Sequence, residues 1–373
     1  MTPNRTPRWF GSPANFDAAT ARSNEIDEQL KKERVTIRGT RFIALFGAPG
    51  AGRSTFLRQA KLHGSGYNTQ EREELGISIQ TTVISAIRLI LEGASIPDDP
   101  TVQLALSSFL EATEPGSDTT NSSVQDQSLL AYRIQELLAV RLIKEVIEAS
   151  PQYQADSSLQ YTMGPIPRIM TSRYTPTDID ILRGKFPPAP PIVEIPFKPP
   201  GAWNESPLQT TLVSVRRDNG LQRKWLTLVG EVEAIIFLVD LSRYDQTEYL
   251  SETEEELNCI RAAMREFESI CNVPLMRFAS AIVVFNKFDL FTEQLTRVPF
   301  TECFPEYTGP NEPAAAVEYC TDRFQALYCV FGVRQRNIRT WCTNCLDVDQ
   351  TGVTLQEIMR SIVRLRLHVV WEV

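Results

Sequence analysis

The hydrophobic pattern of the chain differs between its two halves. From residue 67 to 150 apolar side chains recur at three- and four-residue steps, most regularly over 83–93 and 129–149, and this spacing predicts helices. The polar segment 113–128 between them predicts a loop. Farther on, apolar β-branched runs at 212–215, 234–242 and 281–290 predict strands, with a helix over 254–270. Strands that alternate with helices indicate a parallel sheet with helices on both faces.

An earlier apolar run, Phe42 to Phe46, adds a strand to this α/β pattern, and helical spacing resumes at 54–59. The all-helical block therefore follows the first helix of an α/β domain as an insertion. We expect three parts: an N-terminal arm and helix over 1–40, an α/β domain formed by 41–65 and 179–373, and an inserted helical domain over 66–178.

Two other segments have patterns of their own. Residues 14–34 are alanine-rich and charged, with Ile26 and Leu30 at helical spacing. They predict a polar helix that is either solvated or docked on a partner. Seven prolines between 186 and 200 predict a stiff, extended linker, with a proline-rich ligand for a partner domain as the alternative.

Composition then excludes several classes of protein. The chain has 373 residues, of which 42% are hydrophobic and 23% charged, as in soluble globular proteins. A net charge of −8 without a basic run argues against nucleic-acid binding. No apolar stretch approaches membrane-spanning length, and the N-terminus lacks a signal-peptide core. All seven cysteines lie between Cys259 and Cys345, which favours reduced cytosolic thiols.

A C-x-x-C pair ends the cysteine-containing region, at Cys342 and Cys345. The chain has no second such pair and only two histidines, so a zinc or redox site is disfavoured. We interpret this pair as the end of a strand and the start of a loop.

The stretch after the first strand carries the first candidate chemistry. Its order of strand, glycine-rich loop and helix is that of a P-loop, G-x-x-x-x-G-K-[ST], with arginine in place of lysine. Small residues let backbone N–H groups surround phosphate oxygens, and the following helix N-terminus favours negative charge. The hydroxyl of Ser54 is the candidate ligand for Mg²⁺ between the outer phosphates. The candidate nucleotide-binding residues here are Gly47, Gly50, Ala51, Gly52, Arg53, Ser54 and Thr55.

A second motif, N-K-x-D, directly follows the strand that ends at Phe285. The carboxylate of Asp289 can accept hydrogen bonds from both N1–H and the exocyclic amine of guanine, a pair that adenine does not offer. Asn286 and the stem of Lys287 help to fix this loop and to cover the base. Together the two motifs predict that GTP and GDP bind here.

At this point the sequence resembles the α subunit of heterotrimeric G proteins over nearly its whole length. The most specific matches are SNEID (23–27), the P-loop with FLRQAKLHGSGY, DIDILRGK (178–185), RKWLTLVGEVEAIIFLVDLSRYDQ (223–246), FESICNVP (267–274), FNKFDLF (285–291) and FPEYTGPN (304–311). The resemblance implies a P-loop, Ras-like GTPase domain interrupted by a helical domain that closes over the nucleotide. It also places Thr343 to Cys345 on the family's guanine-contacting loop, with Cys345 at an alanine position.

The same resemblance implies partners. The N-terminal helix and the second switch would dock a βγ dimer, and the C-terminus would meet a seven-helix receptor, whereas the effector is not indicated. The family's myristoylated glycine is replaced by Thr2, and no cysteine lies in the first 200 residues. We therefore expect a cytoplasmic protein that reaches the inner face of the plasma membrane through its partners.

The chain departs from the family at its catalytic positions. Arg53 replaces the P-loop lysine, a swap that changes hydrogen-bonding geometry. In the segment that the resemblance marks as the first switch, Lys185 stands where the family has the arginine that stabilises the transition state, with Arg183 two residues upstream. The magnesium-ligating threonine falls within 187–189, a segment of two prolines and an alanine.

The second switch departs further. By alignment, Ser214 replaces the magnesium-supporting aspartate, Arg216 replaces the γ-phosphate-sensing glycine, and Asp218 replaces the water-orienting glutamine. A carboxylate at that place repels a developing anion. We expect binding without efficient turnover and a weak or dispensable role for Mg²⁺. Two alternatives remain open: a working GTPase that uses Arg183, Lys185 or Asp218 in catalysis, and a nucleotide-free scaffold.

Overall fold

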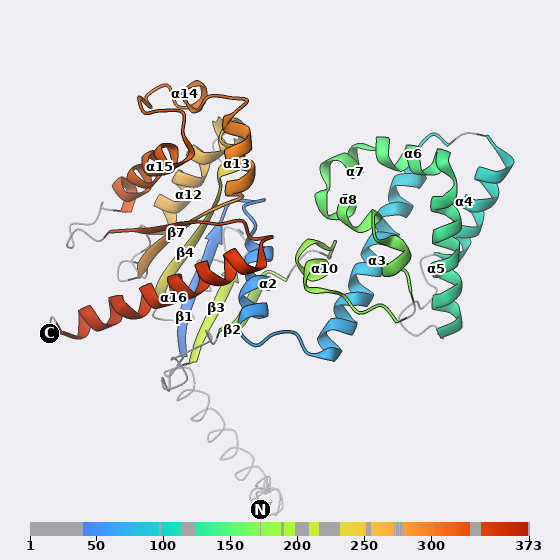
Figure 1. Ribbon diagram of the computed structural model, residues 1–373, viewed down its shortest axis with the longest axis horizontal. Coiled ribbons are helices and arrows are strands. Elements are labelled where there is room, and N and C mark those ends of the chain that lie inside the picture. The colour runs from blue at the N-terminus through green and yellow to red at the C-terminus, as the bar shows by residue number, and fades with distance from the viewer. Residues whose placement is uncertain are drawn as a thin grey trace, which may run out of the picture.

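The computed structural model describes residues 40–96, 98–113, 124–171, 173–187, 190–197, 209–215, 232–250, 255–271, 273, 276, 279–328 and 337–371. The predicted N-terminal helix and Asp218 lie outside these residues. Two structural parts can be described. We call the six-stranded sheet with the helices that cover it the sheet part, and helices α3 to α9 the helical part (Figure 1).

The sheet has the strand order β2-β3-β1-β4-β7-β8. All neighbouring strands run parallel except β2, which pairs antiparallel with β3 at the edge. The strands are β1 (Thr40–Gly47), β2 (Ile192–Phe197), β3 (Gln209–Val215), β4 (Val232–Asp240), β7 (Ser280–Asn286) and β8 (Arg339–Cys342). This arrangement confirms the predicted parallel α/β sheet.

Helices cover both faces of this sheet, because each strand points alternate side chains to opposite faces. In β1, Ala44 and Phe46 join one core with α12 (Cys259–Cys271), α13 (Phe288–Leu295) and α15 (Pro313–Tyr328). Ile43 and Leu45 join the other core with α2 (Arg53–His63) and α16 (Val348–Trp371). The short helix α14 (Phe300–Cys303) and the turn η2 (Leu241–Arg243) complete the sheet part.

The helical part has a hydrophobic core of its own. Ile79, Val83 and Ile87 project from α3 at helical spacing and are fully buried among the neighbouring helices. Its helices are α3 (Thr69–Gly93), α4 (Pro100–Ala112), α5 (Val124–Ala139), α6 (Arg141–Ala149), α7 (Pro151–Ala155), α8 (Ser157–Met163) and α9 (Ile166–Ile169). The boundaries at residues 66 and 178 stay a prediction.

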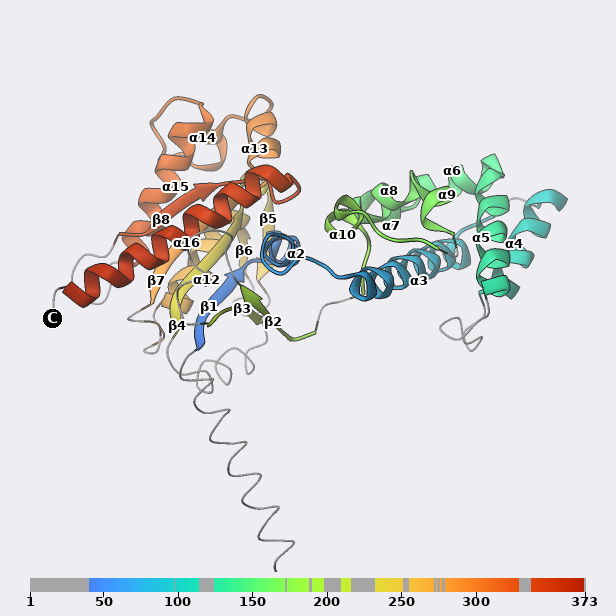
Figure 2. The same ribbon diagram turned by 60° about the horizontal axis from the view of Figure 1, so that its bottom comes forward.

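The two parts lie beside each other, with α2 and α10 (Asp178–Arg183) at their junction in both views (Figures 1 and 2). Helix α10 also packs against α2. The junction thus contains the helix that follows the P-loop and the helix that leads into the predicted first switch.

Several boundaries predicted from sequence are wrong. Helix α5 begins at Val124, within the segment predicted as a loop. Residues 255–258 form β6 (Glu255–Asn258), which pairs with β5 (Thr247–Leu250) instead of extending the helix. The reason is local, since the side chain of Asn258 accepts hydrogen bonds from the N–H groups of Ile260 and Arg261 and so caps α12.

Other corrections concern strand ends and the proline-rich segment. Strand β4 ends at Asp240 rather than 242, where the Asp240 carboxylate caps η2 through the N–H of Ser242. Strand β7 ends at Asn286, one residue past the predicted end at Phe285 and short of the end of the apolar run at 290, because Lys287 adopts a left-handed φ of 56°. Within the predicted linker, β2 is a sheet strand, and its Pro196 is tolerated because β2 is at the edge.

One described helix, α3, is long and apolar enough to suit a membrane span, contrary to the prediction that no stretch approaches that length. Its buried face belongs to the core of the helical part. A core helix of a globular domain meets the same criteria of length and composition.

Candidate functional site

The glycine-rich loop leaves β1 at Gly47 and enters α2 at Arg53. Gly50 and Gly52 have positive φ angles of 82° and 94°, in the region that favours glycine. A Cβ atom on Gly52 would lie 2.2 Å from Nδ2 of Asn286, so no side chain fits there. Gly52 caps α2 without a side-chain hydrogen bond. The first N–H groups of α2 therefore keep the geometry that binds anions.

Asn286 joins the two predicted motifs to each other. Its side chain is buried, and Nδ2 donates a 2.9 Å hydrogen bond to the carbonyl oxygen of Ala51 in the P-loop. Its Oδ1 accepts a 3.0 Å hydrogen bond from the backbone N–H of Cys345. One carboxamide thus connects three segments: the P-loop, the N-K-x-D motif and the loop of Thr343 to Cys345 that the resemblance assigns to guanine.

The other residues of the N-K-x-D motif also have partners. Nζ of Lys287 donates a 2.6 Å hydrogen bond to Oδ2 of Asp240, which ends the neighbouring strand opposite Asn286. Oδ2 of the exposed Asp289 accepts a 2.9 Å hydrogen bond from Nδ2 of Asn344. This second contact sets the Asp289 carboxylate beside the loop that the resemblance assigned to guanine.

Residues 343–347 are fixed by α2 as well as by β7. The backbone N–H of Thr343 donates to the carbonyl of Phe285, which confirms that Cys342 and Cys345 mark a strand end and a loop. Nε2 of the buried Gln59 donates a 2.9 Å hydrogen bond to the carbonyl of Cys345. Burial raises the pKa of Cys345 to about 12, so this thiol stays protonated at neutral pH.

Sequence reasoning missed Asp240, Asn344 and Gln59. Asp240 gave a signal, because it is a polar residue that follows a long apolar run on the strand next to β7. Asn344 lies within the loop that the resemblance had already marked. Gln59 gave no signal, because its role depends on the packing of α2 against the start of α16.

The predicted first-switch cations contact the helical part. Nζ of Lys185 pairs with Oδ2 of Asp156, the residue that caps α8. The guanidinium carbon of the exposed Arg183 lies 5.5 Å from the ring centroid of Tyr161, a cation–π contact. Both side chains therefore have partners across the junction, and their catalytic roles stay predictions.

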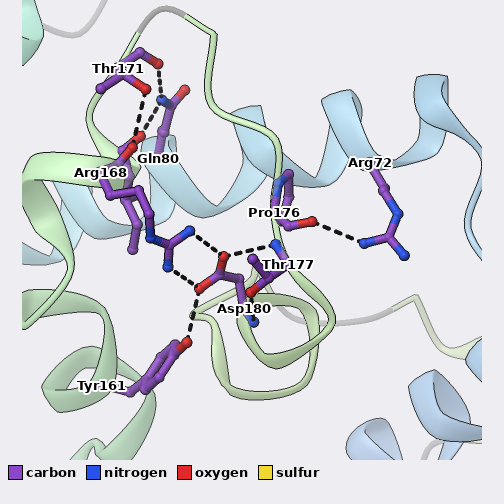
Figure 3. Close-up of polar contacts among 9 residues, drawn as sticks. Arg72, Gln80, Tyr161, Arg168, Thr171, Pro176, Thr177 and Asp180 are labelled. Carbon is purple, nitrogen blue, oxygen red and sulfur yellow. Dashed lines mark hydrogen bonds and ion pairs between the residues drawn. The ribbon is translucent and has the colours of Figure 1, made fainter.

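Asp180 fixes the position of α10 against the helical part (Figure 3). Its buried carboxylate accepts two 2.7 Å hydrogen bonds from Arg168, one of 2.9 Å from the hydroxyl of Tyr161 and one of 2.9 Å from the N–H of Thr177. Burial alone would raise the pKa of Asp180, but these hydrogen bonds outweigh it and hold the pKa well below its ordinary value.

Magnesium is the ion that the resemblance implies beside the P-loop. Of the described candidates, Ser54 offers one exposed hydroxyl, and Ser214 offers a buried hydroxyl where the family has a carboxylate. The described residues contain no cluster of three or more histidine, cysteine, aspartate or glutamate side chains. Magnesium beside a P-loop takes most of its ligands from phosphates and water, so Ser54 fits as one ligand, whereas the neutral Ser214 does not supply the charge of the family's carboxylate.

Comparison with known proteins agrees with this geometry. A profile of the G-protein alpha subunit family matches residues 20–362. A guanine nucleotide-binding protein subunit alpha from Coprinellus congregatus is 32% identical, over 94% of this chain and 96% of the relative. The alpha-1 subunit from Mycosarcoma maydis is 31% identical, over 93% and 95%. The alpha-11 subunit from Caenorhabditis elegans is 28% identical, over 94% and 98%.

Fold and site together define the class of P-loop proteins that bind guanine nucleotides. Within that class, the chain belongs to the G-protein alpha subunit family, since both the profile and relatives above 30% identity cover most of its length. It is a guanine nucleotide-binding signal transducer. Membership of the family implies the partners of a heterotrimeric G protein, a βγ dimer and receptors.

Proposed function

We propose that this alpha subunit exchanges GDP for GTP downstream of a seven-helix receptor and hydrolyses the bound GTP slowly. The nucleotide assignment rests on one observation: the Asn286 side chain connects the P-loop to the loop of Cys345 through two hydrogen bonds. Because these loops are held together, one ligand can contact both the P-loop and the N-K-x-D motif, as a guanine nucleotide does.

Slow hydrolysis is supported by the partners of the catalytic candidates. Lys185 is paired with Asp156, and Arg183 lies against Tyr161, so both cations have competing interactions away from the P-loop. An arginine that stabilises the transition state contributes on the order of 10³-fold or more in rate. A lysine lacks the bidentate geometry of arginine, so its contribution is smaller even when it is released.

The partner interfaces belong to this proposal. The N-terminal helix and the second switch would dock the βγ dimer; the helix lies outside the described residues, and the switch lies outside them beyond Val215. The end of α16 would meet the receptor. Attachment to the inner face of the plasma membrane would then come through these partners.

The test is titration of the purified full chain with a fluorescent, slowly hydrolysed GTP analogue, followed by single-turnover hydrolysis of GTP. We expect saturable binding with turnover far below that of an ordinary alpha subunit measured in parallel. Turnover equal to that of the ordinary subunit would contradict slow hydrolysis and favour a working GTPase with rearranged switches. Absence of binding would contradict the nucleotide assignment and leave a scaffold role.

Base specificity gives a sharper test of the site. Asp289→Asn replaces one acceptor by a donor, so guanine loses a partner for its N1–H and exocyclic amine, whereas xanthine gains one for its 2-oxo group. We expect GTP affinity to fall by about 100-fold or more and XTP affinity to rise, because unpaired polar groups dominate such discrimination. Glu293→Gln, on the exposed face of the same helix, is the matched control and should change neither affinity.

A further inference from the structure

The phosphates of a bound triphosphate carry several negative charges that the protein must offset. In P-loop proteins a lysine and a magnesium ion share this task. In this chain Arg53 replaces the lysine, and the neutral Ser214 replaces the family's magnesium-supporting carboxylate. Protein cations near the P-loop can supply the compensating charge, and two guanidinium groups lie there.

The first guanidinium belongs to Arg53 itself. Arg53 is the first residue of α2, and its NH1 donates a 3.2 Å hydrogen bond to the carbonyl oxygen of Val215 at the end of β3. Ser214 precedes Val215 and shares with Leu212 the sheet face that α2 covers. The Arg53 guanidinium therefore lies next to the position where the family keeps its magnesium-supporting carboxylate. Because Ser214 is neutral, it does not offset the repulsion between this guanidinium and a divalent ion, as the family's carboxylate does.

The second guanidinium comes from the neighbouring strand. Arg243 lies in η2, directly after β4, and a Cβ atom on Gly50 would lie 4.0 Å from its NH1. Its Nε donates a 3.0 Å hydrogen bond to Oε1 of Gln246, and its NH1 lies 3.6 Å from Oε2 of Glu248. These contacts place the guanidinium beside the P-loop with its side chain 28% exposed, and the 3.6 Å spacing to Glu248 is too long for a hydrogen bond that would compete with a phosphate.

We propose that Arg53 and Arg243 replace Mg²⁺ as the counter-cation of the nucleotide phosphates in this chain. Two guanidinium groups carry the same total charge as one magnesium ion, and their planar donor pairs match phosphate oxygens. Arg53 lies on the β3 side of the P-loop and Arg243 on the β4 side. This inference rests on the proposed nucleotide binding and predicts that binding does not need a divalent ion.

The first experiment needs no variant. The full chain is titrated with a fluorescent, slowly hydrolysed GTP analogue in excess Mg²⁺ and again in excess EDTA. We expect dissociation constants that agree within about twofold, because the protein supplies the cations itself. Binding that is tenfold or more tighter in Mg²⁺ would overturn this inference alone. Absence of binding under both conditions would overturn the proposed function, and this inference with it.

Variants then test the two arginines. Arg53→Ala and Arg243→Gln should each weaken binding by about tenfold or more in EDTA, because each removes charge-assisted hydrogen bonds. Arg265→Gln is the matched control, since it breaks an arginine–glutamate pair with Glu255 in β6 but is not among the residues placed at the P-loop. An unchanged affinity in either test variant would overturn the role of that arginine.

A double variant tests whether restoring the family's residues makes nucleotide binding depend on Mg²⁺. Arg53→Lys combined with Ser214→Asp restores the family's residues and the carboxylate next to Val215. We expect this double variant to bind the GTP analogue about tenfold or more tighter in Mg²⁺ than in EDTA, since the ion regains a charged ligand. Equal affinities would show that residues other than these exclude the ion, which contradicts the proposal.

Discussion

The side chain of Asn286 divides its donor and its acceptor between two loops that are far apart in sequence. Nδ2 binds the carbonyl of Ala51, and Oδ1 binds the N–H of Cys345. A buried carboxamide that satisfies two buried backbone groups is costly to lose, because truncation leaves both groups unpaired. Asn286 therefore contributes to stability as well as to the shape of the site.

We predict that Asn286→Ala lowers the free energy of unfolding by about 2–4 kcal/mol, since each buried group left unpaired costs about 1–3 kcal/mol. Nucleotide affinity should fall as well, because the P-loop and the loop of Cys345 lose their common partner. Denaturant unfolding and fluorescent nucleotide titration would measure the two effects.

Asn311→Ala is the matched control for Asn286→Ala. The side chain of Asn311 also bonds two backbone groups, the N–H of Phe300 and the carbonyl of Leu295. Asn311 is exposed, however, and it does not contact the P-loop. It should cost less stability and leave nucleotide affinity unchanged. Equal losses of affinity in both variants would show that Asn286 acts only through general stability.

Asp180 gives a prediction about pH. Its pKa in the folded chain is held well below the ordinary value of 3.8, so the carboxylate stabilises the fold wherever the unfolded chain is also ionised. This stabilisation is fully present above about pH 5 and is lost as pH falls below the unfolded pKa toward the folded one. The fold should therefore lose stability in acid through this residue.

We predict that Asp180→Asn lowers the free energy of unfolding by about 2 kcal/mol at neutral pH, a value reduced because Arg168 is half exposed. The difference between wild type and variant should shrink as pH falls below about 4. Asp178→Asn is the control, because the Asp178 side chain is 45% exposed, whereas that of Asp180 is buried. A difference that stays constant with pH would contradict the linkage.

At the scale of elements, α10 packs against α2, but the polar side chains from α10 to Lys185 have their partners in the helical part. Asp180, Arg183 and Lys185 contact residues in α8, at its N-terminus or in α9. The first switch of this chain is thus coupled to the position of the helical part. Release of Lys185 requires breaking its pair with Asp156.

We predict that Asp156→Asn speeds single-turnover GTP hydrolysis by up to about tenfold, because Lys185 is freed while asparagine still caps α8. Release of phosphate after mixing would measure the rate. Asp99→Asn is the matched control, since Asp99 caps α4 and pairs with no lysine among the described residues. An unchanged rate in Asp156→Asn would mean that Lys185 takes no part in hydrolysis.

At the scale of the whole molecule, the sheet part and the helical part have separate hydrophobic cores. Two cores lie on opposite faces of the sheet, and a third lies within the helical part. The nucleotide site belongs to the sheet part, whereas the first switch reaches across the junction. Binding should therefore stabilise the sheet part and the junction more than the far end of the helical part.

We predict that nucleotide raises the free energy of unfolding by about 2.7 kcal/mol at a free concentration of roughly 100 times Kd. Hydrogen exchange should slow most in residues 47–56, 285–290 and 343–347, and least in α4, which lies far from the junction (Figures 1 and 2). Equal slowing in α4 would mean that the two parts form one cooperative unit.

Sequence alone was enough for the class of the fold and for both nucleotide motifs. Apolar β-branched runs and a 3.6-residue periodicity depend only on local side-chain order, so strands and helices could be recognised directly. The P-loop could be recognised from the spacing of its glycines. Element ends were less predictable where a single residue decides them, as with the cap of α12 at Asn258 and the left-handed backbone of Lys287.

Only the tertiary structure decided which residues share the site. Asn286 meets Ala51 and Cys345, Arg53 meets Val215, and Arg243 comes beside Gly50 across separations that no local pattern records. These contacts depend on strand order, since β3 and β4 both pair with β1 and β7 pairs with β4. The sequence determined the chemistry available, and the order of the strands decided which of those groups lie around the phosphates.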